Sequence, residues 1–107
     1  MRYRESIEDR RLYAGLIRLH LLHHAAAAPF FGQAMIDELA RHGYRISAGT
    51  LYPILHGMER VGYLRSRIKS SHGRQRRLYQ ATAHGRKTLR VARERVRELF
   101  GEMFEHV

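Results

Sequence analysis

Apolar residues recur at helical spacing in the N-terminal part of the chain. Leu12, Leu16 and Leu19 are four and three positions apart, and neighbouring isoleucine and leucine side chains widen the apolar face. This spacing predicts a helix from about residue 10 that is buried against two surfaces instead of one. Pro29 is expected to end the helix, because proline has no backbone N–H to donate. The mixed-charge residues 1–9 are expected to form a frayed or partly docked terminus.

A second amphipathic helix is predicted over residues 33–42. Met35 and Leu39 lie on its apolar side, and charged residues lie on the other side. Gly43 follows at the position after a helix where a left-handed conformation favours glycine. Residues 30–32 are expected to be a short connection from the first helix.

A third helix is predicted to begin at Ser47, whose hydroxyl can accept a hydrogen bond from the first helical turn. Its apolar face is formed by residues three or four positions apart: Leu51, Leu55 and Met58, with Ile54 and Val61 beside them. The opposite face carries polar side chains: Thr50, Tyr52 and His56. Pro53 lies inside this helix and is expected to cause a kink or an irregular first turn. Two amphipathic helices joined by a short turn predict a helix-turn-helix that reads a nucleic acid with this polar face.

Two short strands, residues 63–70 and 75–81, are predicted next, joined by a glycine-containing turn. Leu64 of the first strand and Leu78 of the second are expected to meet on one face. The other face of the first strand carries basic side chains: Arg65, Arg67 and Lys69. The expected fold is therefore mainly α with a small β-hairpin, a winged helix-turn-helix.

The last helix is predicted to begin near Thr82 and to continue almost to the C-terminus. Apolar residues three and four positions apart form a seam along it: Leu89, Ala92, Val96, Leu99 and Met103, with Phe100 and Phe104 flanking. A second copy of the chain is the simplest cover for this seam. We therefore expect residues 1–82 to form a winged-helix domain and residues 83–107 a dimerisation helix within the same compact domain.

The charge balance favours a polyanionic partner. The chain has 107 residues and a formal net charge of +10, which promotes binding through phosphate neutralisation and counterion release. No acidic residue lies between Glu59 and Glu94, so the surplus is concentrated on the hairpin and the start of the last helix. The basic residues expected to contact the DNA backbone are Arg65, Arg67, Lys69, Arg74, Arg76 and Arg77.

Several classes of protein are excluded by what the sequence lacks. The chain has no cysteine, which excludes disulfides, thiolate zinc sites and cysteine nucleophiles. It contains no long apolar run and no apolar signal-peptide core, so we expect a cytoplasmic protein with no membrane partner. A nucleophile elbow, a phosphate-binding glycine loop and a carboxylate pair are also absent. The chain is not expected to be an enzyme.

Four blocks of sequence form a specific pattern: GYRISAGTLYPIL from Gly43 to Leu55, Met58-Glu59 with Gly62-Tyr63-Leu64, GRQRRLY from Gly73 to Tyr79, and TAHG from Thr82 to Gly85. In this order and spacing they resemble the PadR family of bacterial transcriptional regulators. The resemblance implies a winged-helix repressor that needs no cofactor and binds an inverted repeat as a homodimer. It also implies dimerisation through the terminal helix, as in short members without a further C-terminal domain.

The resemblance also assigns roles to individual residues. It implies that phosphates or base edges are contacted by Ser47, Thr50 and Tyr52, and the DNA backbone near the wing by Arg74, Arg76 and Arg77. Pro53 is part of the family's pattern. Residues 31–35 and the LHLLHH stretch of the first helix depart from that pattern. The identity of an effector is therefore not transferred.

Three histidines in the first helix form a candidate metal site: His20, His23 and His24. His20 and His24 are one helical turn apart, a spacing able to hold a transition metal that acts as an effector. The alternative is that all three are surface or half-buried polar residues. Candidate further ligands are Glu5, Glu8, Asp9 and His106.

Aromatic and methionine side chains offer a second kind of effector site. A cavity for a small apolar or phenolic molecule is one reading of the set Phe30, Phe31, Phe100, Met103 and Phe104. Dimer core is the alternative and the favoured one, because apolar stripes at helical spacing are usually packing surfaces. Two other functions stay open beside sequence-specific regulation: a non-specific architectural nucleic-acid-binding protein and a basic protein that binds membrane surfaces or protein partners.

Overall fold

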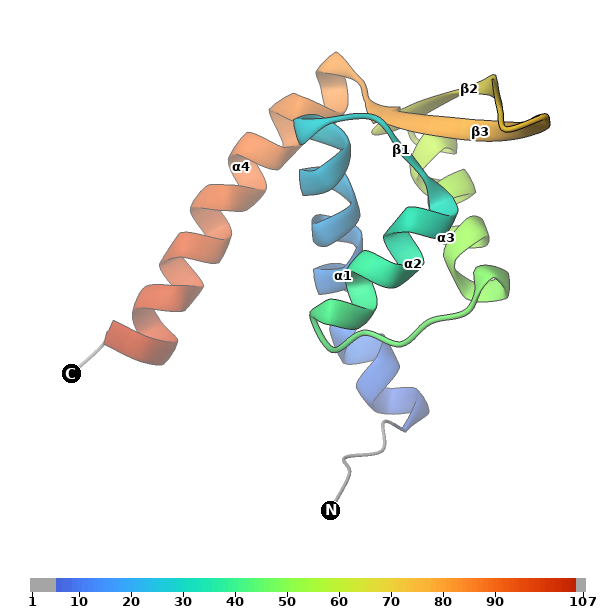
Figure 1. Ribbon diagram of the computed structural model, residues 1–107. Helices are drawn as coiled ribbons and strands as arrows, with labels where there is room; N and C mark the ends of the chain where they lie inside the picture. The colour runs from blue at the N-terminus through green and yellow to red at the C-terminus, as the bar shows by residue number, and fades with distance from the viewer. Residues whose placement is uncertain (1–5, 106–107) are drawn as a thin grey trace.

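The computed structural model describes residues 6–105 and has four α-helices and three strands there (Figure 1). The elements in chain order are α1 (Ile7–Ala27), β1 (Phe30–Phe31), α2 (Gly32–Arg41), α3 (Ala48–Arg60), β2 (Leu64–Ser71), β3 (Arg74–Ala81), α4 (Ala83–Phe100) and the π-helical turn η1 (Gly101–Glu105). The predicted fold class is confirmed. None of the helices within residues 6–105 combines the length and apolarity needed to cross a lipid bilayer.

Helix α1 begins earlier than the sequence pattern predicts. Ser6 accepts a hydrogen bond from the backbone N–H of Asp9, and the Asp9 carboxylate accepts one from the N–H of Ser6. This capping box starts the helix at Ile7, so the expectation of a frayed or partly docked terminus is wrong for residues 6–9. The remaining residues of that expectation, 1–5, lie outside the described part.

One face of α1 is buried, not two. The side chains that pack into the core are Ile17, Leu21, Leu22 and Ala25. Leu12 and Leu16 are 71% and 44% exposed, on the side of α1 that does not enter the core. The helix therefore carries an open apolar strip beside its buried face.

The sheet has three antiparallel strands in the order β1-β3-β2, one strand more than the predicted hairpin. Phe30 pairs with Tyr79 and Phe31 with Leu78. The expectation of a simple connection at residues 30–32 is wrong, because two residues before α2 add an edge strand. Packing of the Phe30 ring near the Tyr79 ring stabilises this short strand.

The hairpin, which we call the wing, comprises β2, β3 and a two-residue turn at His72 and Gly73. Both turn residues have positive φ, 53° and 74°, as in the tight turns whose twist matches that of antiparallel strands. The predicted meeting of Leu64 and Leu78 on one face is wrong, because Leu64 pairs with Ala81 and Leu78 with Arg67. Directly paired residues share a face, so Tyr79 lies on the core face with Leu64 and Leu78 lies on the other.

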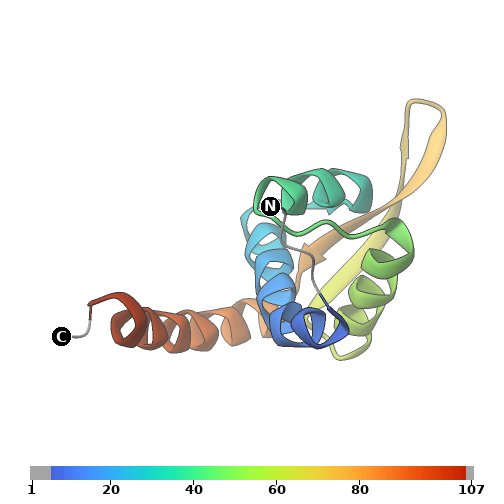
Figure 2. The same ribbon diagram turned by 90° about the horizontal axis from the view of Figure 1, so that it is seen from below.

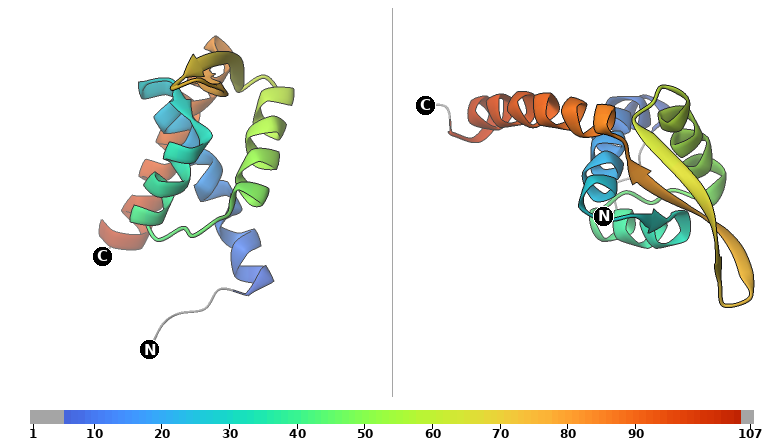
Figure 3. Two further views of the ribbon diagram at one scale, coloured as in Figure 1. Left: turned by 45° about the vertical axis from the view of Figure 1, so that its right-hand side comes forward. Right: turned by 90° about the horizontal axis from the view of Figure 1, so that it is seen from above.

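The start of α4 is fixed to the chain segment that follows α3. Thr82 accepts a hydrogen bond from the N–H of Gly85 and donates its hydroxyl to the carbonyl of Gly62. A side chain at Gly85 would overlap the carbonyl oxygen of Tyr63, so only glycine allows this close approach. From here α4 and the wing project from opposite sides of the helical core (Figures 2 and 3).

Candidate nucleic-acid interface

The N-terminal turn of α3 is an exposed polar surface on a buried support. Leu51 and Leu55 have no exposed area and hold the helix against the core, as predicted. Ser47 occupies the N-cap position, but the predicted cap hydrogen bond is not formed. The Ser47 hydroxyl instead donates to the Thr50 hydroxyl at 3.4 Å. Both side chains are thus exposed and available to a partner, as is His56.

Helix α3 stays helical through Pro53. The proline removes the hydrogen bond to the carbonyl of Gly49, but Gly49 is exposed, so water can take the place of that donor. Val61, predicted on the apolar side, is 58% exposed because it follows the last helical residue. The apolar face of α3 therefore ends at Met58.

Tyr52 lies at the junction of α2, α3 and the wing and is half-buried, not fully on the exposed face. Its ring contacts Gly32, where an added Cβ would come within 2.6 Å of the Tyr52 hydroxyl oxygen. Tyr52 also lines a groove of about 300 Å³ with the first residues of α2 and Arg74 to Arg77 of the wing. The groove places a phenol hydroxyl next to a basic surface.

The wing carries basic side chains on both faces. Its register puts one group on the same face: Arg65, Arg67, Lys69, Arg74 and Arg76. Arg76 lies over the Phe31 ring, with its guanidinium carbon 5.4 Å from the ring centre, an attractive cation–π geometry. Arg77 lies on the opposite face and donates to the Ser66 hydroxyl at 3.0 Å. The alternation of residues along β2 correctly predicted that Arg65, Arg67 and Lys69 share one face.

A second basic region was not predicted from the sequence. A groove of about 360 Å³ lies between α1, the segment before α3 and the start of α3. Its walls include Arg10, Arg18 and Arg45 together with Ser47 and Thr50. Arg10 and Arg18 are eight positions apart, a spacing that keeps two residues on the same side of a helix, and this spacing is the signal in the sequence for that surface.

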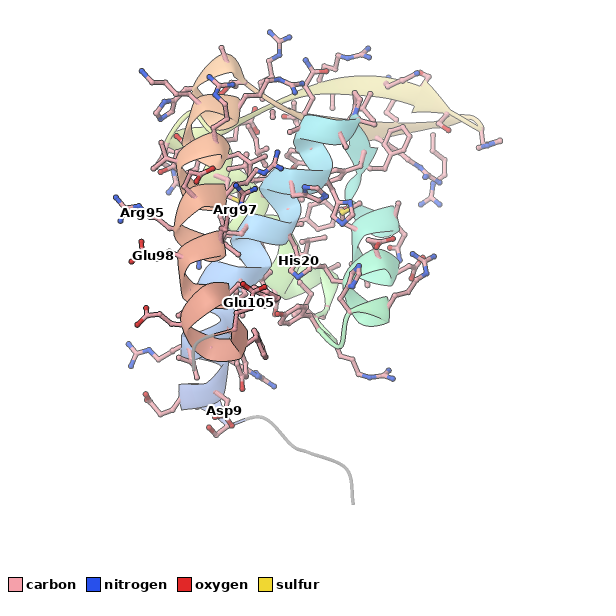
Figure 4. All side chains as sticks on the ribbon, turned by 90° about the vertical axis from the view of Figure 1, so that its left-hand side faces the viewer. Asp9, His20, Arg95, Arg97, Glu98 and Glu105 are labelled. Atoms are coloured by element: carbon pink, nitrogen blue, oxygen red, sulfur yellow. The ribbon has the colours of Figure 1, made fainter. Side chains whose placement is uncertain are left out.

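Helix α4 exposes much of its predicted apolar seam. The seam residues that are 47–63% exposed are Val96, Leu99, Phe100 and Met103. Leu89, Ala92, Val96 and Phe100 line a groove of about 600 Å³ whose other wall is Leu16 and Leu19 of α1. Polar residues occupy another side of α4, where Arg95 and Glu98 point away from α1 (Figure 4).

The five side chains of the candidate aromatic cavity do not come together. Phe30 is buried beside Tyr79, and Phe31 lies under Arg76, so both are in the sheet. Phe100 and Phe104 contact each other at the other end of α4, with ring centres 5.0 Å apart. The helix changes to π geometry at Gly101, so the seam beyond Phe100 no longer follows α-helical spacing.

A histidine cluster lies between α1 and α2. Three ring nitrogens lie within 4.8 Å of one another, one each from His20, His24 and His42. Glu38 is beside them, with its Oε2 atom 2.8 Å from Nε2 of His42 and 3.8 Å from Nε2 of His24. His23 is not in the cluster and instead lines the groove between α1 and α4.

Two histidines of this cluster, His20 and His24, have lowered pKa values. Burial lowers the pKa of His20, and the neighbouring histidines lower it further. Burial also lowers the pKa of His24, against the opposing effect of the Glu38 carboxylate. The hydrogen bond from His42 lowers the pKa of Glu38.

The other candidate ligands near the histidines have different roles or positions. Glu8 lies 3.6 Å from Arg11 at the start of α1, and Asp9 caps the same helix. Glu5 and His106 lie outside the described residues. The structure therefore groups His20 and His24 with His42 and Glu38, and not with Glu8 or Asp9.

Comparisons with known proteins agree on one family. Residues 21–91 match the Transcriptional regulator PadR-like family. Transcriptional regulator Rv3488 of Mycobacterium tuberculosis (strain ATCC 25618 / H37Rv) is 46% identical over 94 residues, which cover 88% of each chain. The matching residues include α2, α3 and the wing.

Solved structures share the arrangement of elements. A PadR family transcriptional regulator from Eggerthella lenta DSM 2243 has a TM-score of 0.76 at 28% identity, covering 89% of this chain and 84% of that chain. A protein from Streptococcus mutans UA159, smu.1704, has a TM-score of 0.75 at 28% identity, covering 94% of this chain and 88% of that chain.

Proposed function

This chain belongs to the PadR-like family of transcriptional regulators, and from that premise we propose that it binds a palindromic DNA operator as a homodimer and represses transcription. It is a transcriptional regulator, not an enzyme. The observation that carries the proposal is the exposed turn of α3 between two basic surfaces. Ser47 and Thr50 lie beside the groove that contains Arg10, Arg18 and Arg45, and Tyr52 lies beside the basic wing.

The proposed interface divides into reading and positioning parts. We propose that Ser47, Thr50, Tyr52 and His56 enter the major groove with α3, where side chains reach base edges. The basic side chains on the wing and at the start of α1 contact phosphates, which supply affinity without sequence information. Specificity then comes from α3 and most of the affinity from the two basic regions.

A second copy of the chain is the proposed cover for the open apolar face of α4. Val96 and Leu99 are about half exposed, and Leu12 and Leu16 of α1 expose more apolar surface nearby. Burying such side chains stabilises an assembly by roughly 25 cal/mol per Å² of apolar area. We propose that residues 83–107 dimerise and residues 1–82 bind DNA, within one compact domain.

Two proposals concern control and location. A small apolar molecule that occupies part of the groove between α1 and α4 is one proposed effector, and a divalent metal ion is another. The regulator itself requires no cofactor in this proposal. Because the proposed operator is chromosomal DNA, we propose a cytoplasmic location.

Selection of genomic fragments bound by the purified protein, followed by footprinting, tests the proposal. We expect a palindromic site whose half-sites are about one duplex turn apart, which is the spacing of two α3 helices in a two-fold dimer. The alternative function, a non-specific architectural protein, predicts salt-sensitive binding to all fragments alike. Equal affinity for selected and random fragments would reject the sequence-specific function.

A further inference from the structure

We propose that His20, His24, His42 and Glu38 bind one divalent transition-metal ion between α1 and α2. The two α1 histidines are one turn apart, and His42, the C-cap residue of α2, lies four positions after Glu38 of that helix. Figure 4 shows His20 on the side of α1 that faces α2, and its ring stacks on that of His42 with centres 5.1 Å apart. α1 thus contributes two donors, and α2 with its C-cap residue contributes the other two.

The donor set matches a four-coordinate metal site. Three imidazoles and one carboxylate are common ligands of zinc, and the three histidine nitrogens already lie within 4.8 Å of one another. Ligand atoms on a tetrahedral zinc ion are about 3.3 Å apart, from a metal–nitrogen distance of about 2.0–2.1 Å. Small side-chain rotations close that difference.

The chemistry of the cluster favours a cation over a purely structural role. His20 and His24 are half-buried, and each ring presents a nitrogen to the space that it shares with His42. Glu38 is oriented by Arg41, whose guanidinium lies 2.6 Å from the Oε1 atom, while Oε2 faces His24 and His42. One carboxylate oxygen is therefore already directed at the cluster.

The ligand types also select the class of ion. Nitrogen donors with one carboxylate and no sulfur suit Zn²⁺, Ni²⁺, Co²⁺ or Cu²⁺, whereas Mg²⁺ and Ca²⁺ prefer sites made of oxygen atoms. The site we propose therefore discriminates against the abundant hard cations.

The position of the site suggests what the metal does. Helix α2 is the first helix of the helix-turn-helix, and α1 forms one wall of the groove on α4. A metal that links α1 to α2 fixes the DNA-reading unit to the proposed dimerisation surface. This regulatory part rests on the proposed function, because a change in operator affinity requires operator binding.

The site itself is tested without DNA. Zn²⁺ is titrated by calorimetry into chelator-treated protein that carries no histidine tag, and Co²⁺ is titrated in parallel to record its visible spectrum. We expect one ion per chain and a tetrahedral Co²⁺ spectrum, with affinity lowered at least about tenfold in His42→Gln, the scale on which losses at metal sites fall. His84→Gln, an exposed histidine outside the cluster, is expected to bind like the wild type.

His23→Gln distinguishes the cross-helix site from a site on α1 alone. We expect it to bind Zn²⁺ like the wild type, since His23 lies outside the cluster. Absence of binding by the wild type, unchanged binding by His42→Gln, or lost binding by His23→Gln would each overturn the proposed ligand set.

The regulatory part is tested with a selected genomic fragment and Zn²⁺. We expect Zn²⁺ to change the fragment affinity of the wild type about fivefold or more, the usual lower range for coupled sites, and to leave that of His42→Gln unchanged. Zn²⁺ binding without any change in fragment affinity overturns the coupling but not the site. Absence of specific fragment binding with and without Zn²⁺ overturns the proposed function and the coupling together.

Discussion

Glu59 near the end of α3 accepts hydrogen bonds from both the backbone N–H and the hydroxyl of Ser66 in β2, at 3.1 Å and 2.9 Å. Arg77 of β3 donates to the same hydroxyl. These bonds connect the helix that presents Thr50 to the strands that present the basic side chains. The relative position of the two proposed DNA-contacting parts is therefore fixed within one chain.

Glu59→Ala should lower the free energy of unfolding by about 1–3 kcal/mol, the usual cost of removing the partner of a partly buried hydrogen-bonding group. Urea denaturation measures the loss. Glu94→Ala is the matched control, because within residues 6–105 Glu94 makes only an exposed ion pair with Arg97 at 3.7 Å, and such pairs contribute little. An equal effect of the two substitutions would contradict the role of Glu59.

Thr50→Ala should weaken binding to a selected operator more than binding to random DNA, because base contacts carry the sequence preference. Tyr52→Phe tests the hydroxyl alone and avoids a cavity at this half-buried side chain. Fluorescence anisotropy on both DNAs measures the difference. Equal losses on the two DNAs would remove Thr50 or Tyr52 from the reading face.

Arg74→Ala should weaken binding to both DNAs and lower the salt slope by about one unit, as expected for one lost phosphate contact. Arg95→Ala removes the same charge from the far side of α4 (Figure 4) and should leave the slope unchanged. Titrations at several salt concentrations give both slopes. Identical slopes for the two variants would argue against a wing contact.

Val96→Glu should convert dimers to monomers, because it puts a charge into the groove between α1 and α4. Val91→Glu is the matched control: Val91 and Val96 are 51% and 47% exposed, but Val91 lies outside the groove between α1 and α4. Light scattering measures the mass of each variant. A Val96→Glu protein that remains dimeric would refute the proposed interface.

Tyr79→Phe should leave the free energy of unfolding unchanged or raise it by about 1 kcal/mol. Within the described residues, the buried Tyr79 hydroxyl has no hydrogen-bond partner. Burial raises the pKa of the Tyr79 hydroxyl, so the folded protein holds the hydroxyl proton more tightly than the unfolded chain does. The free energy of unfolding of the wild type should therefore fall as the pH rises above about 10, and that of Tyr79→Phe should fall less. A clear loss of stability near neutral pH would contradict this.

Gly85→Ala should destabilise the fold by about 1–3 kcal/mol, the usual cost of overpacking, because the new methyl group meets the Tyr63 carbonyl. Gly15→Ala in α1 is the control. Nothing lies within 4 Å of an added Cβ there, so helix propensity should raise stability by about 0.5–1 kcal/mol. Thermal denaturation measures whether each substitution lowers or raises stability. A Gly85→Ala protein as stable as the wild type would rule out the close contact.

Local spacing was enough to predict the helices and the winged fold. Leu51, Leu55 and Met58 form the buried side of α3, because helical periodicity depends on neighbouring residues only. The wing strands were also found, but not their facing residues. A strand's alternation does not tell which set meets the core, so Tyr79 and not Leu78 accompanies Leu64.

Features made by distant residues were not predictable in this way. Strand β1 exists because Phe30 pairs with Tyr79, which lies far along the chain. His42 joins His20 and His24 only because α2 packs beside α1. Sequence spacing can recognise two ligands on one helix, but the partner helix has to be known before the site is complete.

The cap at Thr82 and Gly85 holds one end of α4 to the rest of the domain, so α4 moves together with the DNA-binding part. The helix has 18 residues and is about 27 Å long at 1.5 Å per residue, and the cap at its start is hydrogen-bonded to the segment directly after α3. Because the hydrogen bonds of Thr82 hold the start of α4, a rotation of the far end of the helix is transmitted to the segment after α3. In the proposed dimer, a small change in the angle between the two α4 helices would therefore swing both α3 helices and alter their separation on the duplex.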